Sequence, residues 1–217
     1  GHHMQGPAIV GAAKALKDCA GDRPFSVVVY GTPAEETAHG KLRMLEKGCF
    51  QDIDVALMMH GSPTTCTDVK CLADRSFEVV FHGKGAHAAL APEKGKSARD
   101  GLLIAFNGIE FLREHVPDGV RIHYSYLSAG EKPNVVPDFA EVWYFVRSNR
   151  RRIVDQVTER LIQVARGAAM MSGTEVEWEF LARGKSTRIN TTLAELAYGC
   201  MRRVPLPRWE EPELRLA

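Results

Sequence analysis

Two adjacent glutamates and one histidine follow directly on short apolar segments of this chain. Glu35 and Glu36 come shortly after residues 25–30, and His60 follows residues 53–59. Apolar runs of this length are typical of strands that are buried on both faces of a parallel sheet. Ligands of open α/β sheets bind beyond the carboxyl ends of the strands. The sequence therefore predicts that these three side chains converge at one edge of a sheet.

A pair of carboxylates with an imidazole suits a divalent metal site. One carboxylate can bind the ion while its neighbour polarises the attacking water. Carboxylate and imidazole ligands admit Zn²⁺, Mn²⁺ or Co²⁺. A structural interpretation stays open, because adjacent acidic residues also favour helix N termini and solvated turns. A histidine such as His60 can equally be a hydrogen-bonded loop residue.

Three further polar residues lie in or beside loops farther along the chain. His87 lies in the glycine-rich segment 83–89, and Asn134 lies in the segment 133–138 between two predicted strands. Arg147 ends a predicted strand, where its guanidinium can pair with a ligand carboxylate. The alternative for each of them is an ordinary surface residue.

Strand, helix and strand alternate in residues 1–69. A helix is predicted at 9–16, and a second one at 41–47 is closed by Gly48. Because this second helix lies between the two predicted strands, the order predicts a βαβ unit and a parallel sheet.

Residues 70–185 show a different pattern, in which apolar and polar side chains alternate along half-buried strands. Two amphipathic helices lie between these strands, and Ser97 and Asp100 form a capping pattern at the first. The order β-α-β-β-α-β predicts a ferredoxin-like domain, with an antiparallel sheet covered on one face by two helices. The predicted elements are a strand at 77–82, a helix at 97–114, strands at 120–126 and 139–146, a helix at 151–170 and a strand at 176–180.

The sequence also predicts which side of the first helix faces the core and which element follows the last strand. The predicted core face of the first helix consists of Leu102, Leu103, Phe106, Ile109 and Leu112. After the last strand, a further helix is predicted at 191–203, and two prolines end it.

Composition and charge exclude several classes of protein. Lys and Arg number 28 and Asp and Glu number 27, so the formal charge is +1, which gives no general electrostatic basis for binding nucleic acid. No apolar run approaches the roughly 20 residues that span a bilayer, so no membrane partner is expected. The five cysteines include no C-x-x-C pair. A reducing, cytoplasmic setting is therefore favoured over a disulfide framework.

Four segments together resemble the successive signatures of the M20 metallopeptidases and amidohydrolases. They occur in the same order over nearly the whole chain, and they are most similar to the branch related to aminobenzoyl-glutamate utilisation protein B. The segments are Gly31–Glu36, Asp54–Gly61, Gly83–Ala89 and Asn134–Asp138. The resemblance implies a zinc-peptidase-like catalytic domain interrupted by a ferredoxin-like lid domain that also dimerises.

The resemblance implies roles for the first group of residues. Glu35 corresponds to the general base, and Glu36 and His60 correspond to metal ligands. The opening residues allow two interpretations. His2 is a further ligand if they match the end of the family's C-G-H-N/D segment, whereas they are tag residues if the chain starts at Met4.

The resemblance also implies roles for the lid residues. His87 corresponds to a histidine that steadies the oxyanion in the active site of the partner subunit. Asn134 corresponds to a residue that contacts the substrate, and Arg147 to one that holds a substrate carboxylate.

Members of the family are considerably longer than this chain. We therefore expect part of a catalytic domain at residues 1–69 and 186–217 and a complete lid at 70–185. The resemblance predicts a homodimeric hydrolase that uses Zn²⁺ or Mn²⁺ to cleave acyl- or aryl-amino acid amides, with activity impaired in this fragment. The alternative is a non-catalytic dimerisation or binding module derived from the same family.

Overall fold

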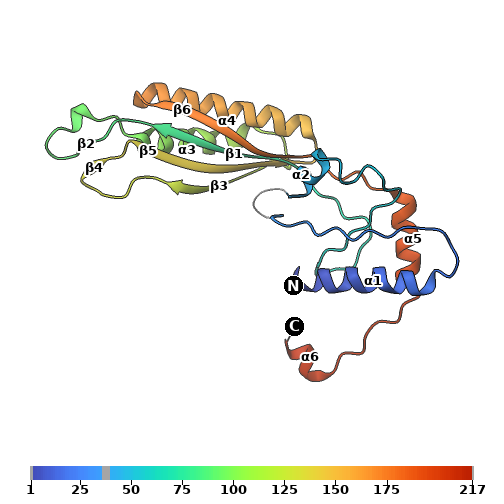
Figure 1. The fold of residues 1–217 in the computed structure, drawn as a ribbon. Helices are drawn as coiled ribbons and strands as arrows, with labels where there is room; N and C mark the ends of the chain where they lie inside the picture. Colours follow the sequence, from blue (N-terminus) through green and yellow to red (C-terminus); the bar gives the residue numbers. More distant parts are fainter. Residues whose placement is uncertain (1, 36–39, 217) are drawn as a thin grey trace. The chain divides into compact units, whose positions relative to one another are not determined.

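The computed structural model describes residues 2–35 and 40–216, within two compact units, Gly1–Cys66 and Thr67–Ala217. The first unit contains helices joined by irregular chain (Figure 1). These helices are η1 at His2–Met4, α1 at Gln5–Cys19 and α2 at Gly40–Glu46. The helices predicted at 9–16 and 41–47 are confirmed. Gly48, just after α2, has a φ of +76°, a left-handed conformation that favours glycine.

The strands predicted at 25–30 and 53–59 are wrong. The structure assigns neither segment to a strand, and Val28, Leu57 and Met58 are 57%, 76% and 74% exposed. A strand buried on both faces needs neighbouring strands for its backbone and covering layers for its side chains. The described part of the first unit provides neither, so the predicted parallel sheet does not form there.

The second unit contains a sheet domain between Ala73 and Gly184. Its elements confirm the predicted order of strands and helices, with longer strands than the sequence pattern marked out. They are β1 at Ala73–His82, β2 at Ala86–His87, η2 at Pro92–Lys94, α3 at Ala98–Leu112, η3 at Arg113–His115, β3 at Arg121–Ser128, β4 at Val135–Val136, β5 at Phe139–Ser148, α4 at Arg151–Ser172 and β6 at Glu175–Gly184.

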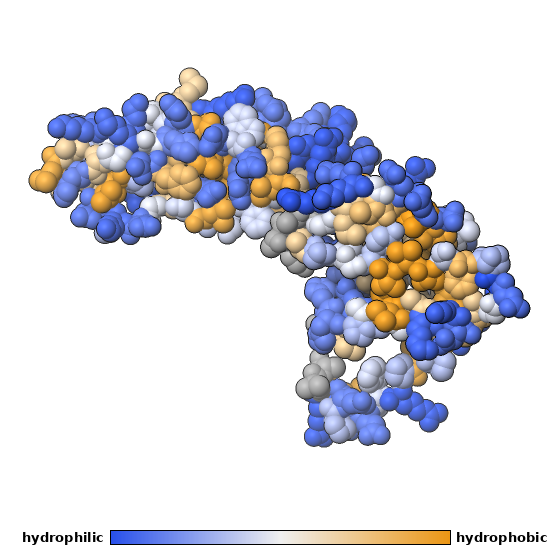
Figure 2. All heavy atoms as spheres, viewed as in Figure 1, coloured by the Kyte–Doolittle hydropathy of each residue, from blue (hydrophilic) through white to orange (hydrophobic). Residues whose placement is uncertain are grey.

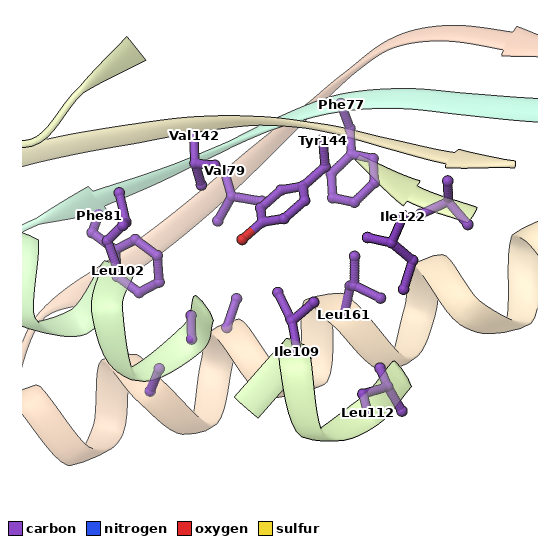
Figure 3. Close-up of a cluster of buried hydrophobic side chains, with 14 of the residues drawn as sticks. Phe77, Val79, Phe81, Leu102, Ile109, Leu112, Ile122, Val142, Tyr144 and Leu161 are labelled. Atoms are coloured by element: carbon purple, nitrogen blue, oxygen red, sulfur yellow. The ribbon is translucent and has the colours of Figure 1, made fainter. Parts of the chain in front are cut away.

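The four long strands form one antiparallel sheet in the order β3-β5-β1-β6. In the chain, α3 lies between β1 and β3, and α4 lies between β5 and β6. Both helices cover the same face of the sheet, and no other helix among the described residues of this domain covers the opposite face (Figure 3). The mixed α/β class predicted from the sequence is therefore confirmed.

The hydrophobic core lies between the sheet and these two helices (Figure 3). Alternate residues of each strand point into it, as a period of two requires. The rings of Phe77 on β1 and Tyr144 on β5 stack with their centroids 5.7 Å apart. Burial raises the pKa of the Tyr144 hydroxyl far above its ordinary value, with smaller contributions from neighbouring tyrosines.

The core face predicted for α3 is confirmed at three of its five positions. Leu102, Ile109 and Leu112 are buried, whereas Phe106 is half-buried and Leu103 is 42% exposed. Consecutive residues of a helix point about 100° apart, so Leu102 and Leu103 cannot both face the sheet. The predicted cap is confirmed, since Ser97 Oγ accepts a hydrogen bond of 3.2 Å from the backbone N–H of Asp100.

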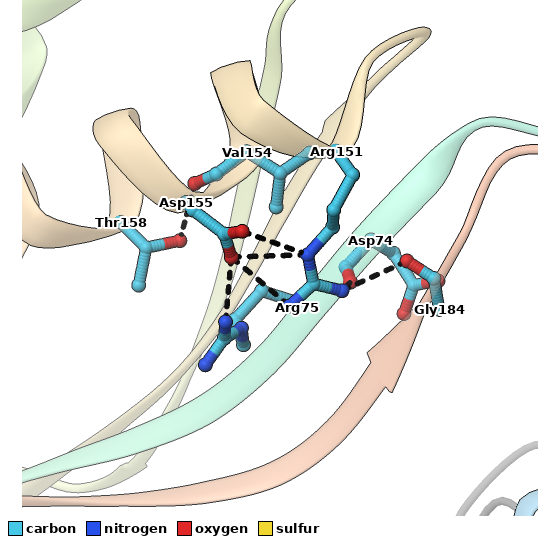
Figure 4. Close-up of polar contacts among 7 residues, drawn as sticks. All are labelled: Asp74, Arg75, Arg151, Val154, Asp155, Thr158 and Gly184. Atoms are coloured by element: carbon cyan, nitrogen blue, oxygen red, sulfur yellow. Dashed lines mark hydrogen bonds and ion pairs between the residues drawn. The ribbon is translucent and has the colours of Figure 1, made fainter.

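A polar cluster at the first turn of α4 joins the two strands by which the chain enters and leaves the domain (Figure 4). Arg151 donates through Nη1 to the carbonyl oxygens of Gly184, at 2.9 Å, and Asp74, at 3.2 Å. Asp155 accepts from Arg151 Nε at 3.0 Å and from Arg75 Nη2 at 2.6 Å. Burial alone would raise the pKa of Asp155, but these two guanidinium groups outweigh it and hold the pKa below its ordinary value.

The chain after the sheet domain is helical in part. The helix predicted at 191–203 is confirmed as α5, Thr191–Met201, and a short helix not predicted from the sequence, α6, occupies Glu211–Leu216. None of the helices in the described part of the chain is long and apolar enough to cross a membrane. Figure 2 shows that the visible face of the sheet domain is largely hydrophilic, with apolar side chains scattered among the charged ones.

Candidate functional site

Two of the predicted metal ligands, His2 and His60, lie side by side in the first unit. Their Nε2 atoms are 3.2 Å apart, and their ring centroids are 4.9 Å apart at an interplanar angle of 64°. His2 begins η1, whereas His60 lies in irregular chain after residues 53–59. The fold therefore brings together two imidazoles that are far apart in the sequence.

The hydrogen bonds of His60 determine which of its nitrogens is available. Nδ1 lies 2.7 Å from the carbonyl oxygen of Gly61 and must donate to it, because a carbonyl oxygen only accepts. The neutral ring then carries its proton on Nδ1 and presents the lone pair of Nε2 toward His2. Metal-binding histidines usually have their second nitrogen held in this way by a carbonyl or carboxylate oxygen.

The spacing of the two Nε2 atoms fits a shared ion. Zinc–nitrogen bonds of about 2.0–2.1 Å place two tetrahedral ligands about 3.3 Å apart. The observed separation of 3.2 Å is close to that value. The same separation is that of an ordinary hydrogen bond between the two rings, with the proton lying between the Nε2 atoms.

Glu35 is exposed in a loop with unusual backbone geometry. Ala34, just before it, has a φ of +56°, which few residues other than glycine adopt. The carbonyl oxygen of Ala34 accepts from Gly40 N at 3.3 Å, and a Cβ on Gly40 would lie 2.0 Å from the carbonyl oxygen of Pro33. Strained backbone of this kind is concentrated at functional sites. The predicted ligand Glu36 lies outside the described residues.

In residues 2–35 and 40–216, no group of three or more His, Cys, Asp or Glu side chains is arranged to hold a metal ion. Of the predicted ligands that the structure describes, His2 and His60 contact each other as a pair. Glu35 is not grouped with it.

The loop that carries His87 is closed by backbone pairing. β2 pairs with β4, so that His87 lies opposite Val135. Lys84 and Lys96 exchange backbone hydrogen bonds of 2.8 and 2.9 Å. A Cβ on Gly83 would lie 2.0 Å from the carbonyl oxygen of Lys96, so only glycine allows the chain to pass there.

The hydrogen bonds of His87 leave its other nitrogen as a donor. Nδ1 accepts from the backbone N–H groups of Ala89 and Leu90, both at 3.3 Å. The neutral ring therefore carries its proton on Nε2. Because His87 is exposed, this N–H can donate to a substrate carbonyl oxygen or to an oxyanion.

Two of the predicted lid residues are close together and the third is remote. The backbone N–H of Ala88 donates to the carbonyl oxygen of Asn134 at 3.0 Å, which places Asn134 beside His87. Arg147 lies near the far end of β5. At about 3.3 Å per residue, the stretch of β5 from Phe139 to Arg147 is about 26 Å long.

Arg147 belongs to a cluster of basic residues, with Arg121 and His123, that sequence reasoning missed. It lies directly opposite Arg121 across the β3–β5 pair, and its guanidinium carbon lies 5.1 Å from the centroid of the Phe145 ring. His123 lies opposite Phe145 on the same face. Burial and the charges of Arg147, Arg113 and Arg121 lower the pKa of His123. The period-two spacing of Arg121 and His123 was the sequence signal that could have identified them.

Comparison with known proteins gives matches along the whole chain. Residues 75–170 match the M20 family of peptidase dimerisation domains. The chain is 35% identical to one of the subunits of p-aminobenzoyl-glutamate hydrolase from Escherichia coli, and the alignment covers all of this chain and 46% of that protein. It is 32% identical to Xaa-Arg dipeptidase of Mus musculus, over 79% of this chain and 40% of that protein. The chain therefore belongs to the M20 family and spans less than half the length of these relatives.

Solved structures show the same fold. An aminobenzoyl-glutamate utilization protein from Klebsiella pneumoniae superimposes with a TM-score of 0.60 at 23% identity, over 75% of this chain and 43% of that one. An amidase of the hydantoinase/carbamoylase family from Burkholderia vietnamiensis superimposes with a TM-score of 0.57 at 14% identity, over 64% and 34%. Identities this low establish a shared fold and leave the chemistry to be argued from the residues.

Proposed function

Because residues 75–170 belong to the M20 family of peptidase dimerisation domains, we propose that the protein is a metal-dependent amidohydrolase acting on acyl- or aryl-amino acids. In this proposal, residues 1–69 and 186–217 are part of the catalytic domain and residues 70–185 are a ferredoxin-like lid. The similarity to p-aminobenzoyl-glutamate hydrolase supports this substrate class. A cytoplasmic location belongs to the same proposal.

The histidine pair is the observation that carries this proposal. Its two Nε2 atoms are 3.2 Å apart, and the carbonyl of Gly61 orients one of the rings. His2, His60 and Glu36 are assigned to hold Zn²⁺ or Mn²⁺, and Glu36 is assigned by family resemblance alone. The similarity to relatives covers the whole chain, which supports His2 as a native residue rather than part of a tag. When bound, the ion supplies Lewis acidity at the reacting carbonyl.

The remaining chemistry falls to side chains of this protein. Glu35 takes a proton from the attacking water as the water oxygen bonds to the amide carbon. It then gives the proton to the nitrogen as the C–N bond breaks, which yields a carboxylic acid and an amine. The Nε2–H of His87 donates to the carbonyl oxygen as negative charge develops there. Asn134 contacts the substrate, and Arg147 pairs with its carboxylate.

One subunit cannot apply all its lid residues to one substrate. His87 and Asn134 lie in the loops before Phe139, and the stretch of β5 from Phe139 to Arg147 is about 26 Å long, which is farther than a small acyl-amino acid extends. Arg147 lies opposite Asp74, at the end of the sheet where the chain enters and leaves the domain. We therefore assign Arg147 to the active site of its own subunit, and His87 and Asn134 to that of a partner.

The edge strand β3 is the surface we assign to this homodimer. It pairs with β5 on one side, and unpaired strand edges favour pairing with a second copy. Tyr124 and Tyr126 on β3 are 38% and 44% exposed and contact Phe106 of α3. A two-fold contact would use this aromatic patch from both copies. Light scattering is expected to give the mass of a dimer.

Zinc titration of the 217-residue chain by calorimetry tests the metal site. We expect one ion per chain, and a loss of affinity of at least about tenfold in His60→Ala, because removing a direct ligand costs more than removing its supporting partner. His2→Ala should behave in the same way, while His115→Ala, an exposed histidine outside the pair, is the control. Unchanged affinity in both pair variants would contradict the assignment.

Subunit mixing tests the catalytic assignments in a chain extended to the length of its relatives. Glu35→Gln alone should reduce turnover by roughly 10²–10⁴-fold without loss of metal, because it removes the general base. His87→Ala alone should also impair turnover. Mixing the two inactive variants should restore activity, since one site of each mixed dimer then contains both groups. No recovery despite demonstrated subunit exchange would exclude action of His87 on the partner's site.

A further inference from the structure

The start of α4 carries positive charge where a helix disfavours it. Arg150, Arg151 and Arg152 follow one another there, and the first turn of the helix contains no Asp or Glu. The N-terminal end of a helix has a partial positive charge, so cations placed there destabilise it. A local conflict of this kind is expected where a residue serves another purpose.

Burial adds to the cost of an arginine at position 151. The side chains of Arg151 and Arg75 are 17% and 13% exposed, and both pair with Asp155. Two guanidinium groups therefore share one carboxylate, and the polar cluster at the first turn of α4 has a net positive charge. A largely buried charge in excess of its partners costs desolvation energy. The stability of the helix thus does not account for Arg151.

In return, Arg151 contacts both segments that connect the sheet domain to the rest of the chain, residues 71–74 and 184–187. Its Nη1 donates to the carbonyl oxygens of Asp74 and Gly184, which are direct cross-strand neighbours (Figure 4). Farther out, the backbone N–H of Thr187 donates to the carbonyl oxygen of Cys71 at 3.1 Å, and that of Cys71 donates to Thr187 Oγ1 at 3.1 Å. Arg151 therefore lies where the two connecting segments are held together.

The same contacts hold the backbone around Arg147. Asp74, whose carbonyl accepts from Arg151, is the direct cross-strand neighbour of Arg147 on β1. Arg147 also precedes Arg151 by only four residues, across the turn between β5 and α4. A change at position 151 therefore reaches Arg147 through β1 and through this turn.

We propose that Arg151 is a positioning residue, which holds the two connecting segments together and so places Arg147 at the active site of its own subunit. This inference rests on the proposed function, in which Arg147 pairs with the substrate carboxylate. Arg151 itself acts only on the protein. A guanidinium suits this role, because its planar fork of donors reaches two carbonyl oxygens and a carboxylate at once, whereas the ammonium of lysine is a single point charge.

Hydrogen exchange on the 217-residue chain tests the contact with the connecting segments without metal or turnover. In Arg151→Gln the amide of Thr187 should exchange about tenfold faster or more, because the segments then open locally. This change should exceed any change at Val79, in the centre of β1, which reports global unfolding. Arg152→Gln is the matched control, since it removes the same charge from an exposed neighbour, and it should leave Thr187 as in wild type.

A second variant keeps this test decisive where Arg151→Gln fails to fold. Arg151→Lys retains the charge beside Asp155 but loses the fork, so it should show the same local opening at Thr187 with a smaller loss of stability. An unchanged rate at Thr187, equal changes at Thr187 and Val79, or an equal effect of Arg152→Gln would overturn the proposal.

A double-mutant cycle in the chain extended to the length of its relatives tests the action through Arg147. Arg151→Gln alone should lower kcat/KM for an acyl-amino acid about tenfold, mainly by raising KM, because a misplaced Arg147 binds the carboxylate less well. In the Arg147→Gln background the same change should cost less than about twofold. A structural role alone would cost the same factor in both backgrounds, and that result would contradict the positioning role.

Failure of the proposed function has a different signature. If the wild-type extended chain hydrolyses no acyl-amino acid, the proposed function is refuted and Arg151 places no substrate-binding residue. The exchange rate of Thr187 still decides whether Arg151 holds the connecting segments together, so the two failures are distinguishable.

Discussion

The sheet domain and the first unit contain equally apolar segments, but only in the sheet domain do these segments form paired strands with buried side chains. Val79 on β1 is 3% exposed, with strands on both sides and helices over one face. Val28 and Leu57 of the first unit lie in runs at least as apolar and are 57% and 76% exposed. The difference shows that a hydrophobic pattern specifies a strand only where partners for its backbone and its side chains are present.

Helices do not depend on partners in the same way. α1 and α2 form in the first unit because a helix satisfies its backbone hydrogen bonds within one segment. A strand must find each of its backbone partners on another segment. The predicted helices are therefore present in both units, whereas the predicted strands are present in one.

Hydrogen exchange should show the largest contrast between the two units. Amides in the centres of β1 and β5 are expected to exchange only on global unfolding. Those in residues 25–30 and 53–59 should exchange near the intrinsic rate, because their backbone groups have no ladder partners. For a domain stability of about 5 kcal/mol, the rates differ by more than about a thousandfold. Equal protection at Val28 and Val79 would refute the comparison.

The sequence predicts this fold well where a segment and its partners are both present. The alternation of residues 139–146 placed β5, and the Ser97 pattern placed the start of α3. The helical period alone does not tell which of two adjacent leucines faces the core, so it also predicts Leu103 there. The strands at 25–30 and 53–59 are predicted from their apolar residues alone, and these carry no information about whether neighbouring strands are available to pair with them.

The candidate site is predictable only in part, for a related reason. Motifs pointed to His60 and His87, but not to the contact of His2 with His60, which depends on how residues 2 and 60 meet in three dimensions. Arg121 and His123 carry no motif. They are significant only because the register of β3 against β5 places them beside Arg147.

A matched pair of leucine truncations sharpens the comparison at single residues. Leu161→Ala in the sheet domain should lower the free energy of unfolding by about 2–5 kcal/mol, because it leaves a cavity beneath a buried strand. Leu161 is 2% exposed and contributes to the core (Figure 3). Leu57→Ala in the first unit should stay within about 0.5 kcal/mol, since its side chain is already in water. Urea denaturation measures both, and a similar loss in both variants would contradict the contrast.

The smallest expected effect is a difference in pH dependence between two aspartates, one in each unit. Asp155 is held by Arg151 and Arg75, and its lowered pKa means that the native state favours the ionised form (Figure 4). Its contribution to stability is therefore complete above the ordinary carboxyl pKa of about 3.9 and is lost as the pH falls through the lower pKa of the folded state. Because Asp155 is 40% exposed, solvent screening limits this contribution to about 1 kcal/mol.

Asp155→Asn should accordingly be less stable than wild type at pH 7 and at pH 5, and this deficit should shrink as the pH falls below about 3.9. Asp18→Asn is the matched control, since Asp18 pairs with Lys14 at 2.5 Å but the two side chains are 56% and 74% exposed. An exposed pair between adjacent turns of a helix contributes about 0.3–0.5 kcal/mol at most. Urea midpoints measured from pH 2.5 to pH 7 should converge for wild type and Asp155→Asn at the acid end and stay nearly parallel for wild type and Asp18→Asn. If both variants converge with wild type, or neither does, the polar cluster at the first turn of α4 stabilises the sheet domain no more than the exposed Lys14–Asp18 ion pair stabilises the first unit.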